Sequence, residues 1–207
     1  MKYKGIIFDL DGVICFTDKY HYLAWKRLAD KLGIYFDETI NNRLRGVSRM
    51  ESLEIILEKS TKKYSKEEKE DFAEQKNKMY VELLEDMTPA DLPKEVKTTL
   101  DHLRKQGVLL AIGSSSKNAK RILKHLGLEN YFDAISDGTN ITKSKPDPEV
   151  FLKAAEYLQL EPQECLVVED AVAGIKAATA GGFDSAGLGE ASECEMTTYP
   201  LSGFAEL

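Results

Sequence analysis

The sequence has few cysteines and no long hydrophobic run. Its three cysteines, Cys15, Cys165 and Cys194, are scattered and fit no metal-ligand spacing, so they support neither a disulfide framework nor a zinc site. We interpret them as buried, unreactive thiols. No apolar run approaches the roughly 18 residues of a membrane span, and the amino terminus has no signal-peptide pattern. The sequence therefore predicts a cytoplasmic protein with no membrane partner.

Positive charge is in the minority in this chain. Lys and Arg number 28 against 35 for Asp and Glu, which gives a net charge of −7. We therefore expect no nucleic-acid partner, and any phosphate must be held by a local pocket. Gly and Pro make up only 14 and 6 of the 207 residues and 43% are hydrophobic, which excludes a collagen-like or disordered chain.

The pattern of apolar residues predicts an α/β core. A buried strand at residues 6–8 runs into a polar turn, and helices and strands alternate from residue 93 onward. Such alternation is typical of a parallel sheet covered on both faces by helices. We predict a doubly wound parallel-sheet (Rossmann-like) core, with helices over 93–106, 118–126, 148–158 and 173–180 and strands over 108–112, 134–135, 165–168 and 185–188. The last dozen residues have too weak a pattern for an assignment.

A helical insert separates the first strand from the rest of this core. Residues 17–86 contain no convincing strand, and amphipathic patterns predict helices over 21–32, 48–59 and 65–84. We therefore expect an α-helical cap domain over residues 15–92, inserted into a core formed by residues 1–14 and 93–207.

Chemically active side chains follow the predicted strands where they end. Loops at the carboxyl edge of a parallel sheet converge on one crevice, so we expect these groups to meet. Four carboxylates, a lysine and a hydroxyl there would suit a hard divalent cation, Mg²⁺, and a phosphoryl group. The groups are Asp9 and Asp11, Ser114 with the following Ser115, Ser116, Lys117 and Asn118, Lys145 before Pro146, and the pair Glu169 and Asp170.

Each of these groups alone has an ordinary structural interpretation. Two aspartates on a loop are most often a solvated turn, and an acidic pair after a strand can be a helix N-cap. The combination at successive strand ends is far less probable by chance. We therefore favour a phosphoryl-transfer site over unrelated turns.

The four groups resemble the motifs of the haloacid dehalogenase superfamily of phosphotransferases in order and context. The resemblance implies that Asp9 is a nucleophile that forms an aspartyl phosphate, and that Asp11 acts as general acid and base. It also implies Mg²⁺ as the cofactor. The implied metal ligands are Asp9, the backbone carbonyl of Asp11, and Asp170 supported by Glu169, while Ser114 and Lys145 would hold the transferring phosphoryl oxygens.

The cap contains a second candidate for phosphate binding. Ser48 and Glu51 have the spacing of a capping box, which places Arg49 in the first turn of a helix. A cation there opposes the helix dipole unless an anion is bound, and the helix amino terminus itself attracts phosphate. The alternative is a solvated surface arginine.

Segments 21–25, 45–49, 76–77 and 114–118 resemble those of the phosphohexomutases within this superfamily, and the similarity extends from residue 1 to about residue 190. A mutase must hold one phosphate while transferring another. The chain departs from the usual residues at Phe16, at Arg45 and at Pro93-Lys94. The residues implied to bind substrate are His21, Gly46, Val47, Ser48, Arg49, Lys76, Ser115, Ser116, Lys117 and Asn118.

Three functions follow for comparison. The first is a monomeric enzyme that interconverts β-D-glucose 1-phosphate and D-glucose 6-phosphate through a bisphosphate. The second is a phosphatase that passes the same aspartyl phosphate to water. The third is a non-catalytic phosphate sensor or receiver-like module, which the inserted helical segment disfavours. The resemblance to phosphohexomutases implies the first of these functions.

Overall fold

The computed structural model describes residues 2–44 and 47–207. Contacts within the chain divide it into two compact units, Met1–Phe16 with Met87–Leu207, and Thr17–Asp86. The predicted boundaries lay at residues 14 and 93. The first unit includes Cys15 and Phe16 because the backbones of Asp11 and Cys15 form an isolated β-bridge. It resumes at Met87, six residues before the predicted boundary, because the Met87 side chain is buried.

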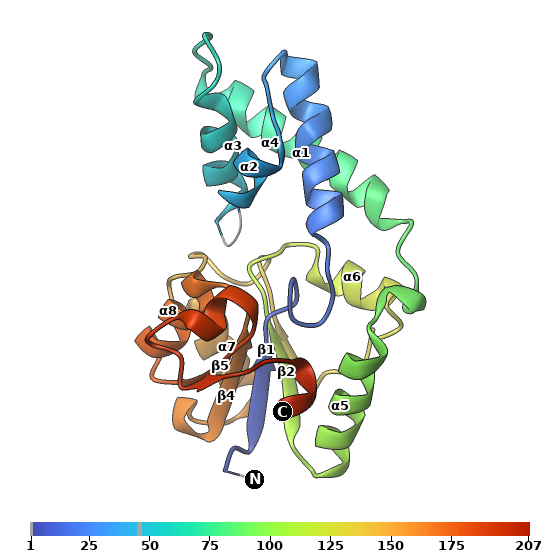
Figure 1. Ribbon diagram of the computed structural model, residues 1–207, viewed down its shortest axis with the longest axis vertical. Helices are drawn as coiled ribbons and strands as arrows, with labels where there is room; N and C mark the ends of the chain where they lie inside the picture. Colours follow the sequence, from blue (N-terminus) through green and yellow to red (C-terminus); the bar gives the residue numbers. More distant parts are fainter. Residues whose placement is uncertain (1, 45–46) are drawn as a thin grey trace. The chain divides into compact units, whose positions relative to one another are not determined.

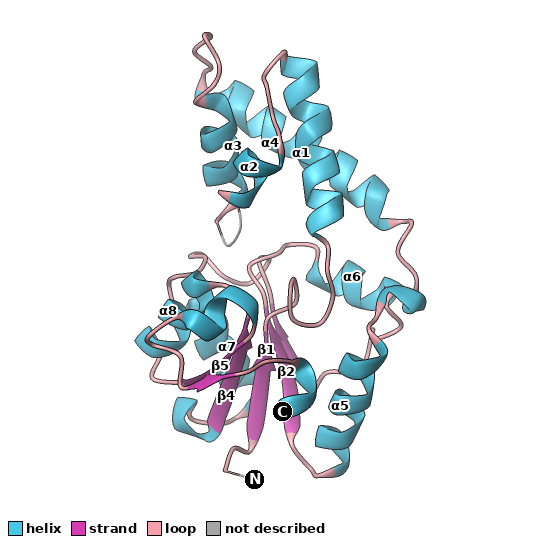
Figure 2. Ribbon diagram, in the orientation of Figure 1, coloured by secondary structure: helices cyan, strands magenta, loops and turns pink. Residues whose placement is uncertain are grey.

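The first unit is built on a six-stranded sheet in which every pair of neighbouring described strands is parallel (Figures 1 and 2). This confirms the predicted doubly wound core. The short β6 was not predicted, because two residues paired to β5 leave no periodic pattern to detect. In spatial order the strands are β3 (Ala134–Ser136), β2 (Leu109–Gly113), β1 (Gly5–Phe8), β4 (Cys165–Glu169), β5 (Asp184–Gly187) and β6 (Tyr199–Pro200).

The order of the strands reverses direction at β1. From β1 the chain proceeds through β2 to β3 on one side, and β4, β5 and β6 follow on the other. Phe8 at the end of β1 is in register with Val168 near the end of β4. In sheets of this kind the crevice for ligands lies at the carboxyl ends of the strands where the order reverses. The ends of β1 and β4 are therefore the expected place for the site.

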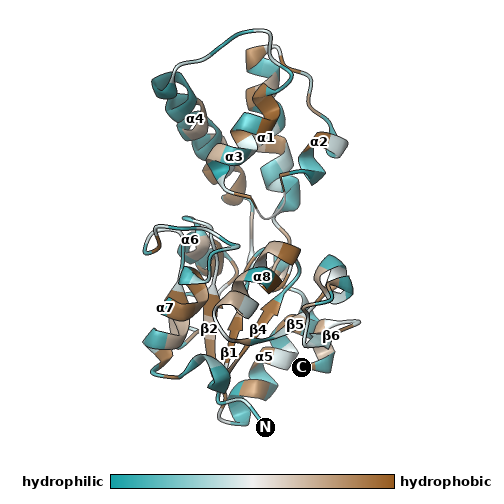
Figure 3. Cartoon of the chain, turned by 90° about the vertical axis from the view of Figure 1, so that its left-hand side faces the viewer, coloured by the Kyte–Doolittle hydropathy of each residue, from teal (hydrophilic) through white to brown (hydrophobic). Residues whose placement is uncertain are grey.

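Helices cover both faces of the sheet. Ile7 of β1 packs with Phe151 of α7 (Glu149–Leu158) and Ala177 of α8 (Val172–Ala180) in one buried cluster. Phe8 points to the opposite face, where its ring stacks on Phe204 with centroids 5.7 Å apart. The hydrophobic strands β1, β2 and β4 appear brown between the helices in Figure 3. The remaining elements of this unit are α5 (Lys94–Lys105), α6 (Ala119–His125), η1 (Pro89–Asp91), η2 (Pro162–Glu164), η3 (Gly189–Glu193) and η4 (Phe204–Glu206).

All regular secondary structure among the described residues of the second unit is helical, as predicted. It contains α1 (Asp18–Leu32), α2 (Glu38–Asn42), α3 (Arg49–Leu57) and α4 (Lys66–Leu84), and α4 contacts both α1 and α3. Trp25, Leu28 and Leu53 belong to its buried core. The sequence missed α2, since five residues are too few to display a helical period.

The structure can be compared with the predictions for membrane-spanning helices and for the three cysteines. Among the described residues, no helix is both long enough and apolar enough to cross a membrane. Cys15 and Cys165 are buried free thiols, as predicted. The prediction is wrong for Cys194, which is only partly buried because it follows η3 in a surface loop.

Candidate active site

Three carboxylates meet where β1 and β4 end. Asp9 directly follows β1, Glu169 is the last residue of β4, and Asp170 follows it. The backbone N–H of Asp9 donates to the carbonyl of Val168 at 2.9 Å, which ties the two strand ends together. One oxygen atom from each carboxylate lies within 4.8 Å of the others. The parallel register thus brings together acids separated by 160 positions in the chain.

Lys145 contributes a positive charge to this carboxylate group. It lies in the loop between β3 and α7, and its Nζ contacts Asp9 Oδ1 and Glu169 Oε1. Its side chain is only 7% exposed. Burial by itself would lower the pKa of Lys145, but the adjacent carboxylates of Asp9 and Glu169 outweigh burial and raise it. The ammonium group is therefore held charged at the point where the acids meet.

The carboxylates carry more negative charge than Lys145 can offset. Burial raises the pKa of Glu169 to about 7 against the opposing effect of Lys145. Burial likewise raises the pKa of Asp170 to about 8, with further contributions from the charges of Asp9 and Glu169. Such a site favours either protons or a cation, and an all-oxygen donor set matches a hard divalent ion. The residues present thus fit the predicted cation site.

The turn after β1 presents Asp11. Gly12 adopts φ +92°, and its N–H donates to the carbonyl of Cys15 at 2.7 Å. Asp11 does not belong to the three-carboxylate group, but its negative charge contributes to raising the pKa of Asp170. Its carboxylate therefore lies near the group without forming part of it.

The loop after β2 contains the predicted phosphate-binding hydroxyls. Ser114 is 2% exposed, and its N–H donates to the carbonyl of Ser136 at 3.0 Å. Ser114 Oγ accepts from the N–H of Ser116, whose own Oγ accepts from the N–H of Asn118, both at 3.2 Å. Ser115 Oγ is buried with no hydrogen-bond partner among the described residues, and Lys117 is exposed. The side-chain bonds thus fix the shape of this loop.

The cap brings His21 and Lys76 into contact. Lys76 Nζ lies 2.8 Å from His21 Nδ1, and the imidazole stacks on Tyr80 with ring centroids 4.1 Å apart. Lys76 is 3% exposed, and its Nζ lies 4.7 Å from the ring centroids of both Trp25 and Tyr80. Burial lowers the pKa of His21 well below its usual value, and the positive charges of Lys76 and Arg49 add to this. The histidine is therefore neutral beside cations.

Arg49 extends this basic group. Its Nη2 donates to Asn77 Oδ1 at 2.9 Å, and burial lowers the pKa of its guanidinium. Ser48 is the N-cap of α3 and forms the predicted capping box with Glu51. Val47 is 39% exposed. The predicted substrate residue Gly46 and the unusual Arg45 lie outside the described residues.

The sequence missed the aromatic side chains in this basic group. Trp25 lies in the resembling segment 21–25 but was not among the predicted substrate residues, and Tyr80 was not selected. A detectable signal existed, because Trp25 follows His21 by one helical turn and Tyr80 follows Lys76 by one turn. The same faces of α1 and α4 therefore present all four side chains.

Comparisons with known proteins assign the chain to one family. The model of the haloacid dehalogenase-like hydrolase family matches residues 3–182. A β-phosphoglucomutase from Bacillus subtilis is 43% identical over 189 residues, which cover 90% of this chain and 84% of that protein. A phosphatase of phosphorylated carbohydrates from Thermotoga maritima is 32% identical over 87% of this chain and 82% of its own.

Solved structures extend the similarity to the fold. The crystal structure of a β-phosphoglucomutase from Clostridium difficile superposes with a TM-score of 0.91 at 40% sequence identity, covering 99% of this chain and 93% of that one. The family match spans both the motifs at the strand ends and the helical insert between them. The chain belongs to the haloacid dehalogenase-like hydrolase family.

Proposed function

We propose that the protein is a Mg²⁺-dependent mutase that interconverts β-D-glucose 1-phosphate and D-glucose 6-phosphate through β-glucose 1,6-bisphosphate. The observation that carries the proposal is the meeting of Asp9, Lys145, Glu169 and Asp170 at one strand edge. The similarity to β-phosphoglucomutases over nearly the whole chain supports the choice of substrate.

Asp9 is the proposed nucleophile. The aspartyl phosphate transfers its phosphoryl group to the 6-hydroxyl of β-glucose 1-phosphate as Asp11 accepts the hydroxyl proton, which gives the bisphosphate and frees the Asp9 carboxylate. After the bisphosphate rebinds in the opposite orientation, Asp9 attacks the phosphorus at C1, and the bond between phosphorus and the sugar oxygen breaks as Asp11 donates the proton to that oxygen, which releases glucose 6-phosphate. Lys145 offsets charge that develops on the transferring oxygens, and Ser114 is the proposed hydroxyl contact.

Mg²⁺ is the proposed cofactor at the carboxylate group. Asp9, Asp170 and the backbone carbonyl of Asp11 would hold it, and Glu169 would support them. When bound, the ion offsets repulsion between the carboxylates and an anionic substrate. The raised pKa values of Glu169 and Asp170, to about 7 and about 8, are consistent with a group that needs additional positive charge.

A mutase also needs residues for the phosphate that does not react. The basic group of the cap, with Arg49 at the amino terminus of α3, has the charge and donors for this role. In the core, the loop residues Ser116, Lys117 and Asn118 are further candidates. Neutral His21, held by Lys76, and exposed Val47 are the other candidates for sugar phosphate contacts in the cap.

The alternative is a phosphatase, favoured by the similarity to the Thermotoga maritima enzyme. Phosphorus NMR of β-glucose 1-phosphate with Mg²⁺ and a trace of bisphosphate separates the two. A mutase converts the substrate to glucose 6-phosphate with little inorganic phosphate. Stoichiometric release of inorganic phosphate without isomerisation would contradict the proposal.

The expected setting of the enzyme is also a proposal. We infer a monomer that acts on free sugar phosphates in the cytoplasm without nucleic-acid or membrane partners. The net charge of −7 supports the lack of nucleic-acid binding. Size-exclusion chromatography with light scattering tests the monomer, and cell fractionation tests the location.

A further inference from the structure

Lys145 is delivered to the active site by an irregular segment. Residues 137–148, all described, contain turns but no helix or strand. The ammonium group must nevertheless sit within contact of both Asp9 and Glu169. A misplacement of about 1 Å in a catalytic site can cost about 100-fold in rate. Some feature outside the carboxylate group must therefore hold this segment in place.

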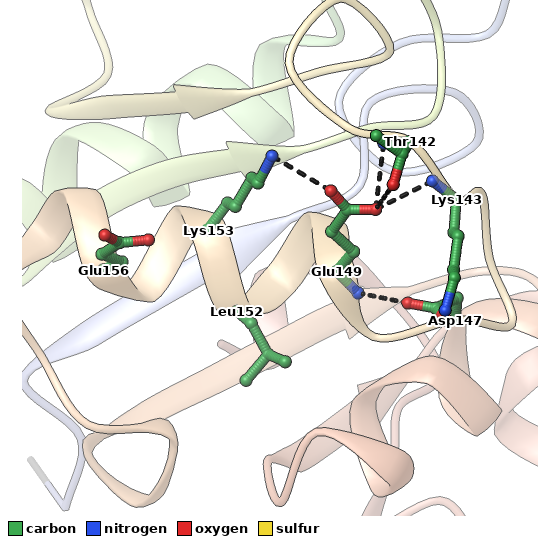
Figure 4. Close-up of a pocket in the computed structure, with 7 residues that line it drawn as sticks. All are labelled: Thr142, Lys143, Asp147, Glu149, Leu152, Lys153 and Glu156. Carbon is green, nitrogen blue, oxygen red and sulfur yellow. Dashed lines mark hydrogen bonds and ion pairs between the residues drawn. The ribbon is translucent and has the colours of Figure 1, made fainter.

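Glu149, the first residue of α7, binds the segment upstream of Lys145. Its Oε2 accepts hydrogen bonds from the N–H of Thr142 at 2.9 Å, from Thr142 Oγ1 at 2.9 Å and from the N–H of Lys143 at 2.8 Å (Figure 4). Three donors on one carboxylate oxygen fix the backbone two residues before Lys145. Because Glu149 belongs to a helix packed on β2 and β3, its own position is set by the sheet.

Lys153, one turn further along α7, strengthens this attachment. Its Nζ lies 3.0 Å from Glu149 Oε1 and also donates to the carbonyl of Asn140. These contacts lower the pKa of Glu149 to about 2, with the Lys153 hydrogen bond as the largest cause. The carboxylate is thus ionised, and both of its oxygens are engaged.

Asp147 binds the segment on the other side of Lys145. Its Oδ1 accepts from the N–H of Glu149 at 3.0 Å, and its N–H donates to the carbonyl of Ser144 at 3.1 Å. The backbone around Lys145 is therefore held to the first turn of α7 both before and after the lysine. The contacts form one continuous brace outside the carboxylate group.

A ligand site is the other interpretation of this region, since these residues line a surface pocket of about 400 Å³. Its two lysines, however, face carboxylates of the chain itself, Lys153 at Glu149 and Lys143 at Asp147. Both lysines are therefore already paired with carboxylates of the protein, so these contacts favour a structural brace over a ligand-binding site.

We propose that Glu149 is a positioning residue for phosphoryl transfer, which acts by holding the 140–147 segment so that Lys145 reaches the transferring group. This inference rests on the phosphoryl transfer proposed above. It assigns to Glu149 an effect on the transition state through Lys145, without contact with the substrate.

The test compares Glu149→Ala with Glu149→Gln and Lys153→Met. Glu149→Ala removes all acceptors, and we expect kcat to fall about 10- to 100-fold with KM nearly unchanged. Glu149→Gln retains an oxygen acceptor and should recover most of the lost kcat. Lys153→Met should have a kcat between those of Glu149→Ala and Glu149→Gln. Glu156→Ala is the matched control, because Glu156 lies on the same helix, is exposed and borders the same pocket.

Orthovanadate provides a readout that lost folding cannot imitate. It mimics a transferring phosphoryl group, and its dissociation constant does not depend on the amount of active enzyme. We expect Glu149→Ala to weaken orthovanadate binding, measured by calorimetry with Mg²⁺, by about 10-fold or more, with Mg²⁺ affinity unchanged. Unchanged orthovanadate affinity, or kcat within twofold of the parent, would overturn the inference.

The outcome for the parent protein keeps the two proposals separate. A parent that binds orthovanadate but does not isomerise glucose phosphates contradicts the proposed substrate, and the binding comparison still decides the role of Glu149. A parent that isomerises normally, with Glu149→Ala equally active, overturns only the positioning role.

Discussion

Gly12 lies directly against the carboxylate of Asp170. A Cβ atom at position 12 would come within 2.0 Å of Asp170 Oδ2, a distance that real atoms do not share without moving. Gly12 also adopts φ +92°, which L side chains rarely occupy. The absence of a side chain at position 12 therefore leaves room for one of the proposed metal ligands.

Gly12→Ala should disturb metal binding. The added methyl group must displace the Asp170 carboxylate, so we expect Mg²⁺ affinity to fall about 10-fold or more, as measured by calorimetry. Gly33→Ala is the control, because φ at Gly33 is +69° and nothing lies within 4 Å of an added Cβ. That variant should lose about 1 kcal/mol of stability with Mg²⁺ affinity unchanged. Equal Mg²⁺ affinity in the two variants would contradict the proposed role of Asp170.

Asp9→Asn should abolish turnover while the protein remains folded. The amide has nearly the same shape as the carboxylate but cannot form a stable aspartyl phosphate, so kcat should fall about 10⁴-fold or more. Asp11→Asn removes only the proposed acid and base, for which a loss of about 10² to 10⁴ is expected. Mass spectrometry of acid-quenched enzyme should detect phosphoenzyme in the Asp11 variant but not in the Asp9 variant. Phosphoenzyme in the Asp9 variant would identify a different nucleophile.

Arg49→Ala should weaken binding of sugar phosphate more than binding of Mg²⁺. A charged hydrogen bond of about 1.5 to 3 kcal/mol corresponds to roughly a 10- to 150-fold rise in KM. Arg43→Ala is the matched control in the same unit, because Arg43 is exposed and paired with Glu58. If both variants raised KM alike, or if Arg49→Ala weakened Mg²⁺ equally, Arg49 would be structural.

The lowered pKa of His21 predicts a pH effect on cap stability. The folded protein holds His21 neutral, whereas in the unfolded chain it binds a proton below a pH of about 6.5. The stability contribution is therefore complete above pH 6.5 or so and is lost as the pH falls toward the lower folded-state pKa. The slope should approach at most about 1.4 kcal/mol per pH unit. Urea unfolding between pH 5 and 8 measures it.

His21→Gln should remove this part of the pH dependence. Carboxylates that titrate in the same range contribute equally to parent and variant, so the difference between the two isolates His21. His102→Gln, at an exposed position on α5, is the control and should leave the parent slope intact. A slope that is unchanged in the His21 variant would show that another group causes the acid sensitivity.

Much of the site could be predicted because its residues follow local rules. Asp9, Glu169 and Asp170 follow runs of buried apolar residues, and parallel strands place such ends at one edge. Ser48 and Glu51 form the predicted capping box because that interaction spans only three residues. A lysine in a loop has no local signature, so Lys145 could be selected only because it stands among the other motifs in the expected order.

Other features could not be found along the chain. β6 pairs with β5 over only two residues, and α2 is a single short turn of helix. The attachment of Glu149 to the 140–143 segment depends on how a loop folds back on a helix, and no sequence period records this. The same holds for the closeness of Gly12 to Asp170.

The sequence by itself determined the α/β class, the helical insert and the candidate groups for the site, because periodicity, capping and strand-end motifs act over a few residues. Only the tertiary structure decided which ionisable groups contact one another. The contacts of Lys145 with Asp9 and Glu169, and of Lys76 with His21, join residues far apart in the chain. Burial, which raises the pKa values of Glu169 and Asp170 and lowers that of His21, arises only when the chain is packed.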